Sequence, residues 1–416
     1  MAPRVLLITS EYPPYAESGL GTHVSILGTG LRQFGCELYV AAYSPDRECE
    51  FADDNLQVKW VSVPPAELHH DGAVQAAGIQ RLNREIIRAA LSLVGNGHFP
   101  PEIIHCHDWY VFPAALHLKQ RFNVPLVSTL HLLLKPYMAC IGEQVPEVQA
   151  ELEGLMCNAS DCLIAVSDAL RQDARTYYEI PFEKVRVVHN GFDLAALAPE
   201  QSLCLNRLKT PLGPDSRATV VYAGSLTPQK GVSALLRSAI SVIKHRPDTS
   251  YLIVGENKHD EYGVLLNELA SNHPSLKGRI QFVGRQSRER LIEFYGLADL
   301  AVVPSLFEAF GFAALEAMAV GVPVVVTDAG GLPEVVHHRE SGLIVPLRKE
   351  AAGRRIVDTA LLAQVQIELL TDRDLAYRLA LTARRRVSTE FSVEKMVRNT
   401  ADLYFSLIAS RDSTYA

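Results

Sequence analysis

Two glutamates eight positions apart are the residues best placed to do chemistry in this chain. Glu308 and Glu316 flank a Phe-Gly-Phe step. The apolar run 299–304 reads as a buried strand ending in a loop that carries Glu308, and 312–320 reads as a helix capped by Gly321. Eight helical residues rise about 12 Å. Two carboxylates so placed can bind the two ends of one elongated ligand.

The same spacing also has a purely structural interpretation, in which Glu308 caps the helix and Glu316 lies on a solvated face. The helix N-terminus argues for a ligand instead, because its unpaired N–H groups and its dipole favour a phosphate or a polar sugar. Gly311 lets such a ligand approach the main chain closely. Alone, the pattern would favour the structural interpretation; the rest of the chain reverses that preference.

Lys230, His131 and a glycine-containing turn also follow predicted strands. Lys230 lies in Thr-Pro-Gln-Lys-Gly after the first strand of the second half, where it can neutralise a diphosphate. His131 directly follows the run 125–130. Gly19 and Gly21 lie between the first strand and a helix expected to start near Thr22, where a phosphate can approach. Taken singly, each also fits an ordinary solvated lysine, strand-end histidine or turn.

His105 and His107 share one face of a strand and so suggest a metal site. Two imidazoles without a third ligand make a poor metal site. The sequence therefore predicts no bound metal.

Taken together and in their order along the chain, the sequence motifs resemble those of the retaining GT-B glycosyltransferases, above all family 4. The resemblance covers nearly the whole chain and is carried by residues 17–24, 105–109, 128–131, 188–193, 223–231, 307–316 and 330–334. It implies transfer of a hexosyl unit from a UDP-, ADP- or GDP-sugar to a hydroxyl acceptor, forming an α-glycoside with retention. The segments 105–109 and 223–231 also resemble glycogen and starch synthases, so an α-glucan or small glucoside is a plausible product.

The resemblance also assigns roles to the candidate residues. Glu308 and the amides of Ala309, Phe310, Gly311 and Phe312 would fix the donor sugar, and Glu316 the ribose. Lys230, Gly19 and Gly21 would bind the diphosphate, and His131 a sugar hydroxyl. No cofactor beyond the donor substrate is expected, and Glu334 could either line the nucleotide side or cap a helix.

Ser225 is the largest departure, because the family usually has an arginine there. A lost cation can cost a factor of about 10²–10³ in rate. Arg285 or Lys258 could compensate; alternatively, the donor binds differently or the chain is a weakened sugar-nucleotide-binding scaffold. A phosphorylase or hydrolase on the same fold is a further alternative.

Composition bounds the class of protein. A chain of 416 residues suits two domains, and its net charge of -7 argues against nucleic acid as the main partner. No apolar run reaches about 18 residues, so no membrane span is expected, although a peripheral membrane contact stays open. Seven cysteines without a C-x-x-C pair, and an N-terminus that enters a strand directly, favour a cytoplasmic protein.

The expected fold class is α/β, with two Rossmann-like, doubly wound domains of the GT-B type facing each other across a cleft. Residues 1–200 would form an acceptor-side domain completed by a C-terminal helix in 392–416, 201–217 a linker, and 218–391 the nucleotide-sugar domain. Strands are expected at 4–10, 37–43, 58–63, 103–107, 125–130, 162–166 and 185–189, and then at 219–223, 250–254, 280–283, 300–303 and 323–326. Ligands would bind at the carboxyl ends of both parallel sheets. The oligomeric state stays open.

Overall fold

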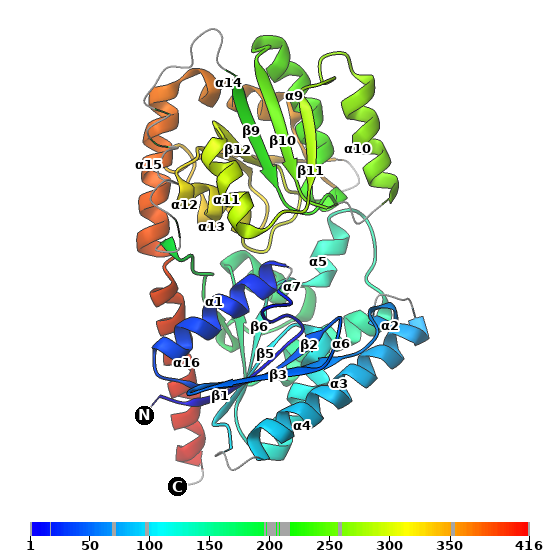
Figure 1. The fold of residues 1–416 in the computed structure, drawn as a ribbon, viewed down its shortest axis with the longest axis vertical. Helices are drawn as coiled ribbons and strands as arrows, with labels where there is room; N and C mark the ends of the chain where they lie inside the picture. The colour runs from blue at the N-terminus through cyan, green and yellow to red at the C-terminus, as the bar shows by residue number, and fades with distance from the viewer. Residues whose placement is uncertain are drawn as a thin grey trace. The chain divides into compact units, whose positions relative to one another are not determined.

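The computed structural model describes residues 2–16, 18–68, 72–95, 100–194, 197, 205, 208, 217–256, 260–350 and 354–414. The chain forms two compact units (Figure 1). Unit 1 comprises Met1–Met138, Gln144–Gly191 and Val393–Ala416, and unit 2 comprises Ala139–Glu143 and Phe192–Ser392. Most of the expected linker 201–217 lies outside the described residues.

Unit 1 is built on an eight-stranded sheet with the order β3-β4-β2-β1-β5-β6-β7-β8. Its strands are β1 Arg4–Thr9, β2 Glu37–Ser44, β3 Cys49–Asp53, β4 Leu56–Ser62, β5 Ile103–His107, β6 Leu126–Leu130, β7 Cys162–Ala165 and β8 Val185–Val187. Its helices are α1 Gly19–Gln33, α2 Pro65–Leu68, α3 Gly72–Gly95, α4 Phe112–Phe122, α5 Leu134–Ala139, α6 Glu147–Ala159, α7 Asp168–Tyr178 and α16 Val393–Thr414, with 3-10 turns at Trp109–Val111 and Phe182–Lys184.

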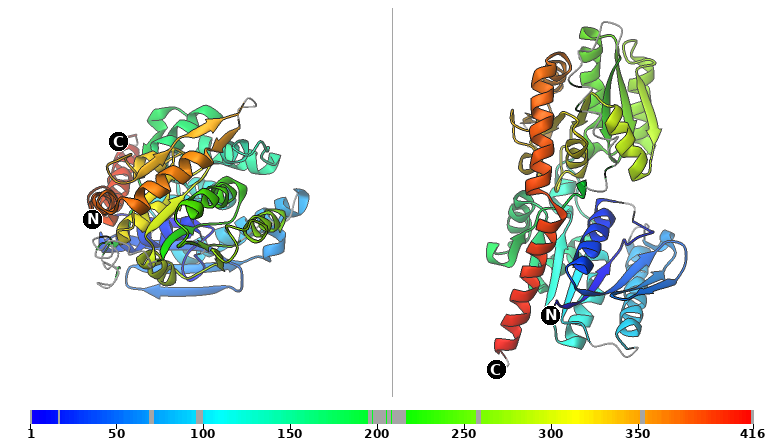
Figure 2. Two further views of the ribbon diagram at one scale, coloured as in Figure 1. Left: turned by 90° about the horizontal axis from the view of Figure 1, so that it is seen from above. Right: turned by 60° about the vertical axis from the view of Figure 1, so that its left-hand side comes forward.

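Strand β1 lies in the middle of this sheet because it is apolar on both faces. Val5 and Leu7 belong to a core that includes Leu27 of α1 and Val397 of α16. Helices α1 and α16 pack against each other (Figures 1 and 2). Alternate residues of β1 point to the opposite face. The last helix of the chain thus completes the core of unit 1.

Unit 2 has a six-stranded parallel sheet with the order β11-β10-β9-β12-β13-β14. Its strands are β9 Ala218–Ala223, β10 Thr249–Val254, β11 Ile280–Gly284, β12 Leu300–Val303, β13 Val324–Thr327 and β14 Leu343–Val345, followed by an antiparallel hairpin of β15 Leu347–Lys349 and β16 Arg355–Val357. Its helices are α9 Val232–His245, α10 Asp260–Asn272, α11 Arg288–Leu297, α12 Phe312–Val320, α13 Leu332–Val335, α14 Thr359–Thr371 and α15 Arg373–Glu390, with a 3-10 turn at Pro228–Lys230.

Helix α12, which contains Glu316, is buried along most of its length. Every residue from Ala314 to Val320 is buried, because the helix packs against β12, β13 and α15. Its composition of Ala, Leu, Met and Val suits that environment and leaves Glu316 as the one charged side chain in the helix. A charged residue in such a place needs a partner or a ligand.

The α/β class with two Rossmann-like units is confirmed, with corrections in detail. The first sheet was predicted to be parallel throughout. This is wrong at one edge, where strand β3 pairs with β4 in antiparallel fashion. The prediction also omitted β14 and the hairpin of β15 and β16. Helix α1 begins at Gly19 rather than near Thr22, because Ser18 caps it by accepting a hydrogen bond from the Leu20 amide. Among the described helices, none combines the length and the apolar character that crossing a bilayer requires.

Candidate functional site

The loop after β12 carries Glu308, whose carboxylate is held by two donors in unit 2. The Lys230 ammonium donates to Oε2 at 2.7 Å, and the Ser305 hydroxyl donates to the same oxygen at 3.1 Å. The side chains of Lys230 and Glu308 are only 25% and 15% exposed. The cation and the first carboxylate singled out in the sequence therefore form one partly buried pair.

Backbone contacts hold the Lys230 turn against the Glu308 loop. The Leu306 amide donates to the Gln229 carbonyl at 2.7 Å. Gly231, with φ of 68°, lies so close to the Pro304 carbonyl that an added Cβ would be 1.9 Å from its oxygen. Only glycine fits there, so the turn and the loop are fixed to each other before any ligand arrives.

A second glycine turn supports Glu308 from the other side. Gly330 has φ of 49°, and an added Cβ would lie 1.9 Å from the Glu308 carbonyl oxygen. The Gly331 amide donates to that same oxygen at 2.9 Å. The two turns together define where Glu308 stands.

The N-terminus of α12 presents main chain rather than side chains. Gly311 is the N-cap with φ of 118°, and no side chain caps the helix. The Phe310 ring is buried and packs edge-on against the rings of Phe312 and Phe391. Ala309 and Phe312 are half-buried. The aromatic ring of Phe310 thus serves packing, and amide groups are what this helix end can offer a ligand.

Glu316 is buried, with 9% of its surface exposed. Burial raises the pKa of its carboxyl group to about 7, while the nearby Arg288 lowers the pKa. Arg288 Nε lies 3.9 Å from Glu316 Oε1, and its guanidinium stacks over the Phe192 ring at 5.2 Å. Arg288 was not among the residues predicted from the sequence. Its place at the start of α11, just after the carboxyl end of β11, was the available signal.

The remaining candidates in unit 2 lie as follows. Ser225 is half-buried, and its carbonyl oxygen accepts a hydrogen bond from the Tyr222 hydroxyl at 2.8 Å. Arg285 is exposed just after β11. Glu334 lies in α13, where its carbonyl oxygen accepts a hydrogen bond from Arg386 at 2.8 Å. Lys258 lies outside the described residues. Among the described residues, Lys230 lies against Glu308, and Arg288 is a further cation that lies against Glu316.

In unit 1, Gly19 and Gly21 form the first turn of α1 rather than a loop. The Ser18 amide donates to Glu11 Oε2 at 2.8 Å. A Cβ at Gly21 would come within 2.5 Å of that carboxylate and 2.8 Å of Ala16. Gly21 is therefore required for the close packing of segment 11–16 on the helix end.

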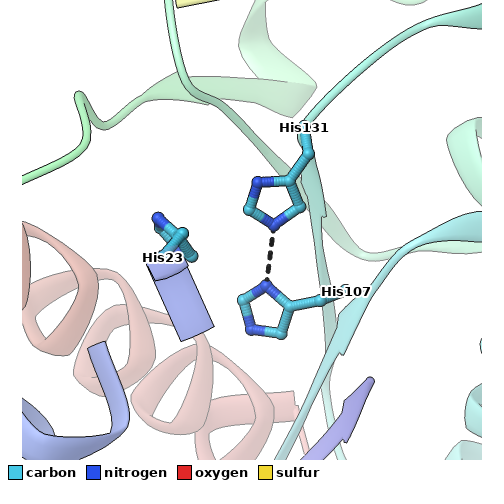
Figure 3. Close-up of side chains that lie close together, drawn as sticks. All are labelled: His23, His107 and His131. Carbon is cyan, nitrogen blue, oxygen red and sulfur yellow. Dashed lines mark hydrogen bonds between the residues drawn. The ribbon is translucent and has the colours of Figure 1, made fainter. Parts of the chain in front are cut away.

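His131 follows β6 and lies in a group of histidines at the carboxyl end of the first sheet (Figure 3). His131 Nε2 lies 3.1 Å from His107 Nδ1, and the two rings are stacked with centroids 5.4 Å apart. His23 of α1 meets the His131 ring edge-on at 4.7 Å. Burial lowers the pKa of His107 and His131 well below the usual value and that of His23 to about 4. All three imidazoles are neutral at pH 7.

The sequence paired His107 with His105, whereas the structure groups His107 with two other histidines. His105, its expected partner, uses both ring nitrogens elsewhere, with Tyr404 at 2.6 Å and Thr129 at 2.7 Å. The group around His107 instead consists of His23 and His131, which come from distant positions in the sequence. Sheet order and helix packing bring them together, and neither can be read from local spacing.

Asp108 is a further polar residue at this edge of the sheet. It has φ of 86°, a backbone conformation that is costly for a non-glycine residue. Its carboxylate accepts a hydrogen bond from Ser10 at 3.1 Å, and burial raises its pKa to about 6. The residue types of segment 105–109 give no sign of this backbone strain.

Two family models match this chain. Residues 18–196 match the description "Glycosyltransferase Family 4", and residues 208–371 match "Glycosyl transferases group 1". The first covers the segment with the histidine group, and the second covers the segment with Lys230, Glu308 and Glu316.

Two relatives and one solved structure are similar over nearly the whole chain. A glycogen synthase from Mycobacterium tuberculosis is 29% identical over 97% of this chain and 94% of its own length. An alpha-maltose-1-phosphate synthase from the same species is 30% identical over 98% of this chain and 100% of its own length. The structure of a sucrose-phosphate synthase from Thermosynechococcus elongatus has a TM-score of 0.77 at 22% identity, covering 98% of this chain and 100% of that one.

Proposed function

Because the chain belongs to the group 1 and family 4 glycosyltransferases, we propose that it transfers a hexosyl unit from a nucleoside diphosphate sugar to a hydroxyl acceptor with retention of configuration. The main support for this proposal is the arrangement of two glutamates around α12. Glu308 stands at the helix N-terminus, fixed by Lys230, and Glu316 lies buried farther along the same helix.

In this proposal each group at α12 has a separate task. Glu308 and the amides from Ala309 to Phe312 hydrogen-bond the sugar hydroxyls. Glu316 accepts hydrogen bonds from the ribose hydroxyls, for which its buried carboxylate is suited. Lys230 stabilises the negative charge that grows on the leaving diphosphate.

The roles of the unit 1 residues follow the family resemblance and are part of the same proposal. His131 hydrogen-bonds a sugar hydroxyl, and the α1 N-terminus at Gly19 and Gly21 contributes to phosphate binding. The leaving phosphate oxygen takes the proton of the acceptor hydroxyl, so the reaction needs neither a covalent nucleophile nor a bound metal. The names of the two mycobacterial relatives support an α-glucoside as the product.

Ser225 motivates one competing candidate, a sugar-nucleotide-binding scaffold with weakened catalysis. We propose that Arg288 supplies part of the missing positive charge at the donor site, since it lies against Glu316. Ser225→Arg separates the two candidates. A gain of about 10²-fold or more in the transfer rate would support the scaffold with weakened catalysis. A lower rate would show that the donor site requires Ser225, as expected of an active transferase.

The proposal is tested first by calorimetry with UDP-, ADP- and GDP-glucose, comparing the wild type with Glu316→Ala and the control Glu268→Ala. Glu268 is an exposed glutamate on α10 of the same unit. We expect binding selective for one base, lost in Glu316→Ala and retained in Glu268→Ala. No binding of any nucleotide sugar would refute the donor site.

Product analysis tests the reaction itself. Incubation with the selected donor and a set of glucosides should give an α-linked product, identified by the anomeric proton coupling in NMR. A β-linked product would refute retention. Release of free sugar or of sugar 1-phosphate as the sole product would favour the hydrolase or phosphorylase alternatives.

A further inference from the structure

Three imidazoles converge at the carboxyl end of the unit 1 sheet. His107 is the last residue of β5, His131 follows β6, and His23 lies on the buried face of α1. One ring nitrogen from each lies within 4.8 Å of the other two. Figure 3 shows His107 and His131 facing each other, with His23 beside them.

The hydrogen bond of His23 determines which of its nitrogens is available. Nδ1 lies 2.6 Å from the side-chain oxygen of Asn190, and because a carbonyl oxygen only accepts, Nδ1 carries the proton. Nε2 then keeps its lone pair. It is buried and finds no hydrogen-bond donor in the described part of the chain. A buried acceptor left in this state is costly unless a donor, a proton or a cation reaches it.

The contact between His107 and His131 suits the same interpretation. Their facing nitrogens are 3.1 Å apart, which fits either one shared proton or two ligands of one cation. Nitrogens that bind zinc at about 2.0–2.1 Å in tetrahedral geometry are about 3.4 Å apart. The facing pair of nitrogens is close to that separation, and the His23 nitrogen lies within 4.8 Å of both.

We propose that His23 Nε2, His107 Nδ1 and His131 Nε2 bind one divalent transition-metal ion of the zinc class, with a fourth position open to solvent or ligand. An all-imidazole set selects zinc, cobalt, nickel or copper over magnesium and calcium. Asn190 is the outer-shell partner that orients His23. His105 is not a ligand; its ring lies 4.1 Å from that of His107 and supports it.

This site has a consequence for the transferase reaction. His131 is the side chain proposed to hydrogen-bond the donor sugar, so an ion bound to its Nε2 withdraws that nitrogen. Zinc should therefore inhibit transfer, with a midpoint that follows the Kd of the site. The metal-binding test below does not depend on activity, so its outcome and that of the proposed function can be told apart.

The experiment is a titration of untagged, chelator-treated protein with Co²⁺, followed by its visible absorption, with Zn²⁺ competition and metal analysis after dialysis. We expect one ion per chain. His23→Ala should weaken binding by more than 100-fold, and His23→Gln serves as a second variant of similar shape. His117→Ala is the matched control, because His117 is exposed on α4 of the same unit.

Asn190 provides a test that leaves all three ligands in place. Asn190→Ala should weaken binding by about 10–100-fold, as is typical for loss of an outer-shell partner. Asn190→Asp, which keeps an acceptor for His23 Nδ1, should restore it. The proposal is overturned if the wild type binds no ion, or if correctly folded His23→Ala and His23→Gln bind as tightly as the wild type.

Discussion

Removing Lys230 tests both the stability and the chemistry of the Glu308 loop. In Lys230→Met, the Glu308 carboxylate keeps only the Ser305 hydroxyl from its two donors. Exposed ion pairs contribute at most about 1 kcal/mol, whereas breaking a fully buried pair costs about 3–5 kcal/mol. Because this pair is partly buried, we expect the free energy of unfolding of unit 2 to fall by about 1–2 kcal/mol.

A double-mutant cycle isolates the pair from other effects. Glu308→Gln removes the charge that Lys230 compensates, so the double variant should lose less stability than the two single losses added together, by about 1 kcal/mol. Circular dichroism during urea unfolding follows both units. The chain's two tryptophans, Trp60 and Trp109, lie in unit 1, so their fluorescence reports on that unit alone. A shift in the fluorescence transition alone would contradict a local effect in unit 2.

The same variant should lose far more activity than stability. Loss of one preorganised charge at a developing anion costs about 10²–10³ in kcat, so Lys230→Met should be nearly inactive at a temperature where it is fully folded. Lys230→Arg, which keeps the charge, should retain more activity. If Lys230→Met loses stability as expected but keeps wild-type kcat, the lysine only holds Glu308, and its role at the leaving diphosphate is refuted.

Three further predictions concern other features. Gly330→Ala should cost at least about 2 kcal/mol more stability than Gly278→Ala in denaturation, because both have positive φ but only the Gly330 Cβ would meet the Glu308 carbonyl; equal costs would contradict the close approach. Glu153 is a buried residue of α6, and burial raises its pKa to about 7 from 4.5, so its contribution to stability is complete below pH 4.5 and lost as pH rises through 7. The stability difference between wild type and Glu153→Gln should accordingly fall by about 3 kcal/mol over that window, and a flat difference would refute the shift. Donor affinity should decrease as pH falls below about 7, where Glu316 gains a proton; in calorimetry, Glu316→Gln should bind weakly and without this pH dependence.

The buried strands were predictable because they are short apolar runs with many β-branched residues. Strand 300–303 was predicted with the bounds of β12, and 103–107 with those of β5. Strand β3 was missed because it is an edge strand with mostly exposed residues, and its sequence lacks an apolar run. The start of α1 was misplaced because Gly19 and Gly21 suggested a loop, whereas close packing against Glu11 and Ala16 is what requires Gly21.

The site was only partly predictable, because some of its contacts join segments that are far apart in the sequence. Residues that follow parallel strands must gather at one edge of each sheet, so Lys230 and Glu308 could be placed at the same edge from sequence. Their direct pairing depends on the glycine turns that fix two distant loops. The histidine group depends on a helix residue, His23, which was not among the candidates and which lies on the buried face of α1 with Leu27 and Leu31.

Glu308 and Glu316 lie in opposite electrostatic environments. This difference determines how much binding free energy each carboxylate can contribute when a ligand donates hydrogen bonds to it. Glu308 already has a cation at 2.7 Å and a hydroxyl at 3.1 Å, so a sugar hydroxyl adds to a satisfied group. Glu316 is buried with its cation 3.9 Å away, beyond hydrogen-bond distance. Hydroxyl donors arriving at Glu316 relieve a desolvated carboxylate, and such bonds are stronger than those between neutral groups. Most of the affinity should therefore come from the nucleoside end of the donor, so the nucleoside diphosphate alone should bind nearly as tightly as the full donor.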